Sequence, residues 1–253
     1  MIQDVDLPLE RFPVRAPGPG DWVLFCKGRE VAFAPWTPVA KTVQALVAVG
    51  ERTIFLGAGP GMEPGSAQRL RALADDALRF AAFTALHLAQ WLLSHRYCGR
   101  CAGPLMLHAG ALRCVDCAQE IYPTIAPAVI LGLVRNGRLL VTHYANRPYR
   151  GPALVAGYCE VGETVEETCR REALEETGLK VGRLTYFASQ PWGLSGSLLL
   201  GFFGEALAGD ITLADGELAD AQWLLPSELP PPPDAAGPLS LTATMIEHFR
   251  TRN

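Results

Sequence analysis

The segment from Gly157 to Leu179 constrains the fold of this 253-residue chain more than any other part of it. Thr164 is followed three residues later by Glu167, and this capping box predicts that a helix begins there. Gly178 suits the left-handed position at which helices end. The segment therefore predicts a helix over Val165–Thr177. Its apolar residues recur at intervals of four and give it one buried stripe: Val165, Cys169 and Ala173.

Three glutamates lie on one face of this predicted helix. Glu172, Glu175 and Glu176 stand at positions i, i+3 and i+4, so their carboxylates are neighbours. A solvated acidic face is the alternative interpretation, but such a face normally interleaves Lys or Arg. Mg²⁺ or Mn²⁺ would remove the repulsion, since both favour oxygen ligands and bridge carboxylates to phosphates. A metal there would lower the pKa of a bound water and stabilise charge on a pyrophosphate. Arg171 could orient one carboxylate by a bidentate pair.

The whole segment follows the pattern Gly-x5-Glu-x7-Arg-Glu-apolar-x-Glu-Glu-x-Gly-apolar and resembles the Nudix box. The resemblance implies an α/β/α sandwich with a mixed sheet that hydrolyses nucleoside diphosphates linked to another group. It implies that Glu172 and Glu176 are metal ligands and that Glu175 is a further ligand or a base. It implies that Glu163 supports the loop before the helix. In relatives the carbonyl before the box glycine, here that of Ala156, also reaches a metal.

Four of the seven cysteines form two Cys-x-x-Cys pairs separated by twelve residues: Cys98 with Cys101, and Cys114 with Cys117. Four thiolates at this spacing are typical of a tetrahedral Zn²⁺ site. A redox pair, a rubredoxin-like iron site and unrelated buried cysteines are the alternatives. Because four protein ligands leave no open position, the zinc would be structural.

Changes in composition and residue pattern divide the chain into three predicted domains: a small α+β domain over 1–94, a zinc ribbon over 95–122 and a Nudix domain over 123–253. The first contains short strand-like runs and closes with a helical pattern over about Ala67–Ser94. It shows no catalytic constellation.

Within the third domain, Asn136-Gly137 lies between the apolar runs Ala128–Val134 and Arg138–His143, which predicts a tight hairpin. A further strand is expected over Ser197–Leu207, and a last helix over about Ser240–Arg252.

Composition restricts the compartment and the partners. Hydrophobic residues make up 49% of the chain and charged residues 19%, as in ordinary globular proteins. The net charge of −4 argues against a broad nucleic-acid surface. No run reaches the roughly 20 apolar residues of a membrane helix, and the N-terminus lacks a secretory pattern. We therefore expect a cytoplasmic protein without a membrane partner.

A four-Cys ribbon directly before a Nudix domain resembles the NADH pyrophosphatase branch, which includes the NAD-capped RNA hydrolases. That branch carries a Ser-Gln-Pro-Trp-Pro-Phe-Pro-x-Ser motif. In this chain the central Pro-Phe-Pro is replaced by Gly-Leu-Ser, which is smaller and more flexible. The resemblance implies a substrate-binding role for the residues after the first serine: Gln190, Pro191, Trp192, Gly193, Leu194, Ser195, Gly196 and Ser197.

The same resemblance implies further site residues. Tyr122 and Tyr158 match positions where aromatic rings stack on a base. Glu217 matches an acid outside the box that approaches the metals. Thr242 stands where relatives have an alanine that contacts substrate. Relatives of this branch are homodimers, and we expect the same here.

The leading hypothesis is hydrolysis of NADH or NAD to nicotinamide mononucleotide and AMP with Mg²⁺ or Mn²⁺. The altered loop keeps other substrates open, namely ADP-ribose, FAD, dinucleoside polyphosphates and the NAD cap of RNA. A non-catalytic nucleotide sensor is the third hypothesis, and the complete acidic box argues against it.

Overall fold

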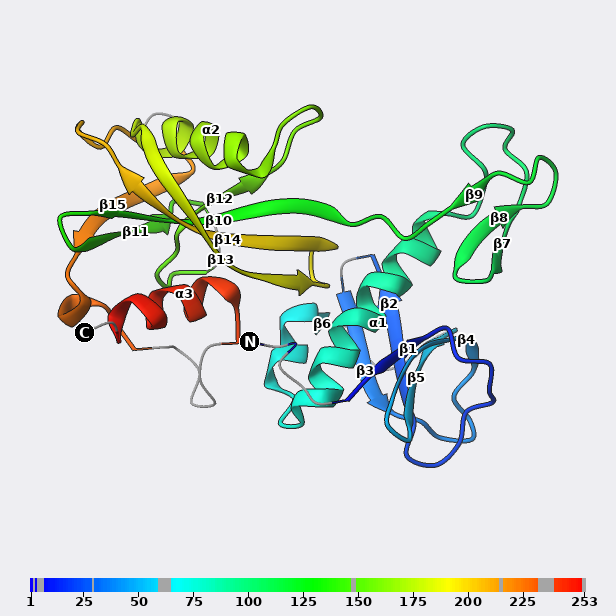
Figure 1. Ribbon diagram of the computed structural model, residues 1–253. Coiled ribbons are helices and arrows are strands. Elements are labelled where there is room, and N and C mark those ends of the chain that lie inside the picture. The colour runs from blue at the N-terminus through cyan, green and yellow to red at the C-terminus, as the bar shows by residue number, and fades with distance from the viewer. Residues whose placement is uncertain are drawn as a thin grey trace. The chain divides into compact units, whose positions relative to one another are not determined.

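The computed structural model describes residues 1, 3, 7–28, 30–58, 65–146, 149–213, 216–231 and 239–251. The chain divides into two compact units (Figure 1). The C-terminal unit comprises Met1, Ala126–Pro191 and Ser197–Asn253. The N-terminal unit comprises Ile2–Ile125 together with the short segment Trp192–Gly196.

The N-terminal unit contains a six-stranded sheet and one long helix. The strand order is β1-β4-β5-β2-β3-β6. Helix α1 (Asp76–Ser94) packs its apolar side chains against the sheet to form one core. The strands are β1 (Leu9–Arg11), β2 (Trp22–Lys27), β3 (Glu30–Pro35), β4 (Thr42–Val49), β5 (Arg52–Gly57) and β6 (Gly65–Ser66).

The single helix expected over Ala67–Ser94 is wrong in one respect, because the structure breaks it in two. A 3₁₀ helix, η1, spans Ala67–Ala72, and α1 begins only at Asp76. The Asp75 side chain accepts a hydrogen bond from the backbone N–H of Leu78 and caps α1. Asp75 is therefore a helix start signal that the apolar periodicity conceals.

A small three-stranded sheet follows α1 and carries the four cysteines. Its order is β7-β8-β9, with β7 at Leu105–His108, β8 at Ala111–Cys114 and β9 at Glu120–Ile121. Both pairings are antiparallel.

The C-terminal unit is a mixed sheet between two helices. The sheet order is β13-β14-β10-β11-β15, and β12 also pairs with β10. Strands β10 and β14 are parallel, whereas β11 and β12 run antiparallel to β10. The elements are β10 (Ala126–Arg135), β11 (Arg138–Tyr144), β12 (Val155–Tyr158), α2 (Val165–Thr177), β13 (Val181–Trp192), β14 (Ser197–Ala206), β15 (Leu218–Leu224), the 3₁₀ helix η2 (Pro226–Glu228) and α3 (Leu241–Arg250).

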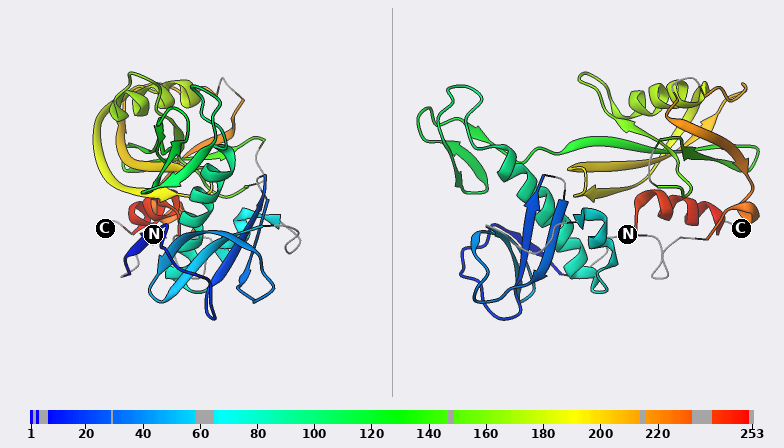
Figure 2. Two further views of the ribbon diagram at one scale, coloured as in Figure 1. Left: turned by 90° about the vertical axis from the view of Figure 1, so that its right-hand side faces the viewer. Right: turned by 180° about the vertical axis from the view of Figure 1, so that it is seen from behind.

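The alternation of side chains along β10 explains the three layers of this unit. Val129 and Leu131 pack in a cluster with Cys169 of α2, whereas Ile130 packs with Met245 of α3. Each such fully buried aliphatic side chain contributes about 1.5–3 kcal/mol of burial free energy. Helices α2 and α3 accordingly cover opposite faces of the sheet (Figure 2).

The hairpin predicted at Asn136-Gly137 is confirmed. It joins β10 to β11, and both central residues have positive φ, 52° and 72°. The last helix begins at Leu241 after the N-cap Ser240 and ends at Arg250, two residues before the predicted end. Among the described residues, no helix combines the length and apolarity needed to span a membrane.

Candidate active site

Helix α2 begins and ends where its sequence signals predict. The Thr164 hydroxyl accepts from the N–H of Glu167 at 3.2 Å, and the Glu167 carboxylate accepts from the N–H of Thr164 at 2.8 Å. Gly178 has φ 71°, and its N–H donates to the carbonyl of Leu174 at 2.9 Å. Cys169 and the rest of the apolar stripe turn inward. The glutamates therefore occupy a helix whose rotation is fixed by its core.

Arg171 is the centre of the charge network on this helix. Its Nε and Nη2 donate to the two oxygens of Glu163 at 2.6 and 3.0 Å, which is a bidentate pair. Its Nη1 donates to Glu172 at 2.7 Å and to Glu175 at 2.9 Å, and its Nη2 also reaches the carbonyl of Tyr158. The hydrogen bonds from Arg171 lower the pKa of Glu163 to about 2. One guanidinium thus offsets much of the repulsion among these acids.

Glu172 and Glu176 converge on the backbone of strand β12. The backbone N–H of Ala156 donates to Glu176 at 3.4 Å, and Glu176 is 3% exposed. A Cβ on Gly157 would overlap the carboxylate of Glu172, so glycine is required for this close approach. Burial raises the pKa of Glu172, and the charges of Glu175 and Glu217 raise it further. Glu217 therefore lies within electrostatic reach of Glu172.

The oxygen donors of this site fit a divalent cation. Glu172 and Glu176 present carboxylates from one helix turn toward the same short stretch of β12. A nearby cation would favour the ionised form of Glu172, which burial opposes. In the described part of the chain, the four cysteines are the one group whose ligand atoms all lie within 4.8 Å of one another. The carboxylates of the described glutamates are thus spaced more widely than the four sulfurs.

The four cysteine sulfurs have the geometry of a closed tetrahedral site. The Sγ atoms of Cys98 and Cys117 lie 3.7 Å apart, and those of Cys101 and Cys114 lie 3.5 Å apart. Zinc–sulfur bonds of about 2.3 Å in a tetrahedron require sulfurs about 3.8 Å apart. The N–H groups of Arg100 and Cys101 lower the pKa of Cys98 to about 7, which favours the thiolate. The cluster therefore fits Zn²⁺.

Tyr158 and Ser197, two residues predicted to bind substrate, are in contact. The Ser197 hydroxyl donates to the phenol oxygen of Tyr158 at 3.3 Å. Both strands flank β10, in which Ala128 pairs with Tyr158 and Ala126 pairs with Ser197. Ser197 is buried, whereas 52% of Tyr158 remains exposed. The tyrosine ring is thus held at one end and open to a ligand over much of its surface.

Gln190 and Thr242 lie at the junction of β13 and α3. Gln190 is fully buried, and its amide bonds the backbone beside the start of α3. Thr242 lies in the first turn of that helix and is half-buried, while Pro191 is exposed at the end of β13.

The segment Trp192–Gly196 belongs to the N-terminal unit, where it packs on α1. The Trp192 ring lies 5.4 Å from that of Phe83, and the Arg71 guanidinium lies over it at 5.7 Å. Leu194 packs against the same core. A Cβ on Gly193 would overlap the carbonyl of Phe83. Packing therefore requires glycine at this position. The replacement of Pro-Phe-Pro by Gly-Leu-Ser in the sequence did not reveal this requirement.

Tyr122 also belongs to the N-terminal unit. It is exposed, and its hydroxyl donates to Glu120 at 3.2 Å, which raises the pKa of the phenol. The structure thus describes Tyr122 and Trp192–Gly196 in one unit, and the glutamates, Tyr158, Ser197 and Thr242 in the other.

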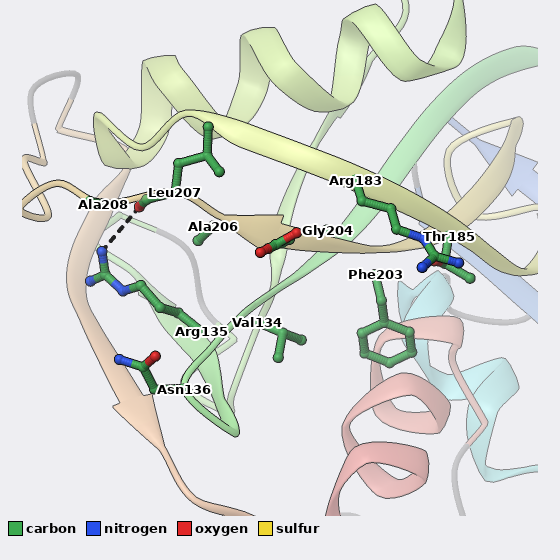
Figure 3. Close-up of a pocket in the computed structure, with 11 residues that line it drawn as sticks. Val134, Arg135, Asn136, Arg183, Thr185, Phe203, Gly204, Ala206, Leu207 and Ala208 are labelled. Atoms are coloured by element: carbon green, nitrogen blue, oxygen red, sulfur yellow. Dashed lines mark hydrogen bonds between the residues drawn. The ribbon is translucent and has the colours of Figure 1, made fainter.

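One pocket of the C-terminal unit contains none of these residues. It has a volume of about 760 Å³ and is lined by the β10–β11 turn and by parts of β13 and β14, including Arg183, Phe203 and Glu205 (Figure 3). Arg135 in its wall donates to the carbonyls of Leu207 and Gly209 at 3.2 and 2.8 Å. The acidic site is therefore not this pocket.

Comparisons with known proteins agree with this geometry. The NUDIX domain model matches residues 124–245. The chain is 42% identical over 173 residues to the NAD-capped RNA hydrolase NudC of Chromobacterium violaceum, a match that spans 66% of this chain and 63% of that protein. It is 34% identical over 221 residues to the NAD-capped RNA hydrolase NudC of Salmonella schwarzengrund, covering 78% of this chain and 84% of that protein. A NUDIX hydrolase from Nitrosomonas europaea shares the fold, with a TM-score of 0.51, 20% identity, and coverage of 62% of this chain and 92% of that one.

Proposed function

The chain belongs to the Nudix hydrolase family, and we propose that it cleaves the pyrophosphate bond of NADH or NAD to give nicotinamide mononucleotide and AMP. The observation that carries the proposal is the convergence of Glu172 and Glu176 on β12 beside the Arg171 network. The relatedness to NAD-capped RNA hydrolases supports a substrate that contains NAD.

In this proposal, the carboxylates of Glu172, Glu176 and Glu217 and the carbonyl of Ala156 would hold Mg²⁺ or Mn²⁺. When bound, such a cation would supply a lowered pKa for a water and stabilisation of charge on the pyrophosphate. Arg171 keeps Glu172 and its neighbours in one orientation through the contacts described above. Glu175, more than half exposed, is a further ligand or accepts the proton of the attacking water.

The remaining predicted residues serve binding and structure. The exposed ring of Tyr158 would stack on a base, with Ser197 holding its hydroxyl. A role in substrate binding for Tyr122, for Thr242 and for the loop from Pro191 to Ser197 stays a prediction from the sequence. The zinc of the four cysteines would be structural. The homodimer and the cytoplasmic location stay predictions from the sequence.

The NAD cap of an RNA 5′ end is the second candidate substrate. The similarity to NAD-capped RNA hydrolases favours this substrate, because the bond to be cleaved is the same as in NAD. ADP-ribose, FAD and dinucleoside polyphosphates remain alternatives, since Gly193 and Leu194 pack into a core where the branch motif has proline and phenylalanine.

The test incubates the purified protein with NADH and Mg²⁺ or Mn²⁺ and measures AMP and nicotinamide mononucleotide. Glu176→Gln should lower kcat about a hundredfold or more, because a lost metal ligand weakens charge stabilisation by several kcal/mol. Glu166→Gln, an exposed residue of the same helix, is the matched control and should retain activity. No AMP from the wild type with either metal, or full activity of Glu176→Gln, would contradict the proposal.

The same assay ranks the substrates. NADH, NAD, NAD-capped RNA, ADP-ribose and FAD are compared by kcat/KM. A clear preference for a substrate without nicotinamide would replace NAD(H) as the proposed substrate while leaving the chemistry unchanged. Tight nucleotide binding without turnover would instead indicate a sensor.

A further inference from the structure

Gln190 is buried and bonded in a way that its predicted role as a substrate ligand does not require. The residue is 0% exposed. Its Nε2 donates to the carbonyl of Leu239 at 3.0 Å, and its Oε1 accepts from the N–H of Leu241 at 2.7 Å. Both ends of the side-chain amide are therefore engaged by the backbone at the beginning of α3.

This position is where a helix needs partners. The first N–H groups of a helix have no partner within it, and Leu241 is the first residue of α3. The Ser240 hydroxyl accepts a hydrogen bond from the N–H of Ala243 at 3.3 Å. The side-chain oxygen of Gln190 accepts from another of these donors, the N–H of Leu241. A buried N–H or carbonyl without a partner is costly, so the amide of Gln190 stabilises this helix start directly.

The remaining contacts of α3 reinforce the same junction. Leu241 and Met245 are buried in the cluster that joins α3 to the sheet, and a Cβ on Gly201 of β14 would meet both of them. Thr242 lies immediately after the residue that Gln190 holds. The first turn of α3 is thereby tied to the end of β13, the strand that leads into the proposed substrate loop.

We propose that Gln190 is a positioning residue, which fixes the first turn of α3 and with it Thr242, and thereby sets substrate affinity without touching the substrate. The proposal rests on the proposed function only for the final step, from the position of Thr242 to affinity. Its first step, the anchoring of α3 by Gln190, is independent of any activity.

The first test measures hydrogen exchange in a peptide that covers residues 239–245. Gln190→Leu keeps the approximate volume and removes both hydrogen bonds, so exchange there should accelerate. The matched control is Gln222→Leu, because Gln222 is an exposed glutamine of the same unit whose Nε2 donates to the carboxylate of Asp220. Unchanged exchange in Gln190→Leu would overturn the anchoring role.

The second test separates positioning from direct contact by steady-state kinetics. Gln190→Leu should raise KM by about tenfold, the equivalent of roughly one lost buried hydrogen bond, and leave kcat within about twofold. The factor should be the same for NADH, NAD and ADP-ribose, because a displaced first turn of α3 would weaken the binding of all three substrates. A factor confined to one substrate, or an equal loss in kcat, would mean that Gln190 contacts the substrate and would overturn the proposal.

Gln190→Glu covers the case in which the leucine variant fails to fold. A buried carboxylic acid has a raised pKa, and only its protonated form can donate to the Leu239 carbonyl as the amide does. The affinity of this variant for substrate, and the protection of its residues 239–245 from hydrogen exchange, should therefore increase as the pH falls from 8 to 5, relative to the Gln222→Glu control. No such difference between the two variants would refute the role of Gln190.

The outcomes also separate this inference from the proposed function. A wild-type protein that hydrolyses none of the nucleotides would refute the function, whereas faster exchange at 239–245 in Gln190→Leu would still support the anchoring. Hydrolysis by the wild type with unchanged KM in Gln190→Leu would refute the inference alone.

Discussion

Gly157→Ala should disable Glu172 without removing any acidic group. The added Cβ would lie under 3.0 Å from both carboxylate oxygens and from Cδ of Glu172, whereas ordinary contact begins at 3.4 Å. The overlap includes the whole carboxylate, so the group must retreat by more than 1 Å. A misplacement of that size costs about a hundredfold in rate, or roughly 3 kcal/mol of transition-state stabilisation.

The retreat cannot be absorbed easily. Glu172 is held by Arg171 at 2.7 Å, and Arg171 is held in turn by Glu163 at 2.6 and 3.0 Å. Gly157 itself pairs with Val129 in the β10–β12 ladder, so its backbone is also fixed. The expected result is a kcat reduced about a hundredfold with the fold retained.

The assay is AMP release from NADH with Mn²⁺, together with thermal unfolding of each variant. Gly182→Ala is the matched control, because Gly182 is also a strand glycine of the C-terminal unit. A Cβ there would meet only the flexible end of Leu207 at 3.1 Å and atoms of Glu205 at 3.7 Å. If Gly157→Ala retained kcat within threefold of Gly182→Ala, the argument that Gly157 makes room for a catalytic carboxylate would be wrong.

Two further perturbations follow from the charges and thiols. Glu163→Gln should lower kcat/KM about tenfold, since Arg171 loses its bidentate partner. Because the pKa of Glu163 is lowered from 4.5 to about 2, its stabilising effect is present above pH 4.5 and is lost as the pH falls toward 2. The difference in Tm between wild type and variant should shrink over that window, and a constant difference would contradict the pairing. One zinc per chain should be found by elemental analysis, and Cys101→Ser or a chelator should remove it and lower the Tm, whereas Cys26→Ser should leave the zinc bound. Zinc affinity should fall below about pH 7 as Cys98 regains its proton, and a pH-independent affinity would contradict the thiolate site.

Short-range patterns in the sequence predicted helix α2 and the β10–β11 hairpin of the C-terminal unit. The bounds of α2 follow from Thr164, Glu167 and Gly178, because capping groups and the residues that they serve are separated by a few positions. The hairpin at Asn136-Gly137 follows from the need for positive φ at both residues. The break before α1 was missed, since the apolar periodicity runs on through the cap at Asp75.

Part of the candidate site could be predicted from the sequence, and part of it depended on the tertiary structure. The spacing of Glu172, Glu175 and Glu176 places them on one helix face whatever the rest of the chain does. The Cys-x-x-Cys pairs likewise indicate a metal site by spacing, and the structure gathers their four sulfurs. The sharing of Arg171 among three carboxylates involves Glu163 in a preceding loop, and that contact depends on how the loop folds back.

Only the tertiary structure could decide which distant residues complete these local features. Glu172 lies over Gly157 because α2 packs on β12. Gln190 bonds Leu241, which is 51 residues away in the chain. No periodicity or motif encodes such contacts, because they arise from the packing of whole elements against a shared core. The sequence by itself determined the acidic helix and the two Cys-x-x-Cys pairs, and the packing determined which side chains contact the glutamates and how the four sulfurs come together.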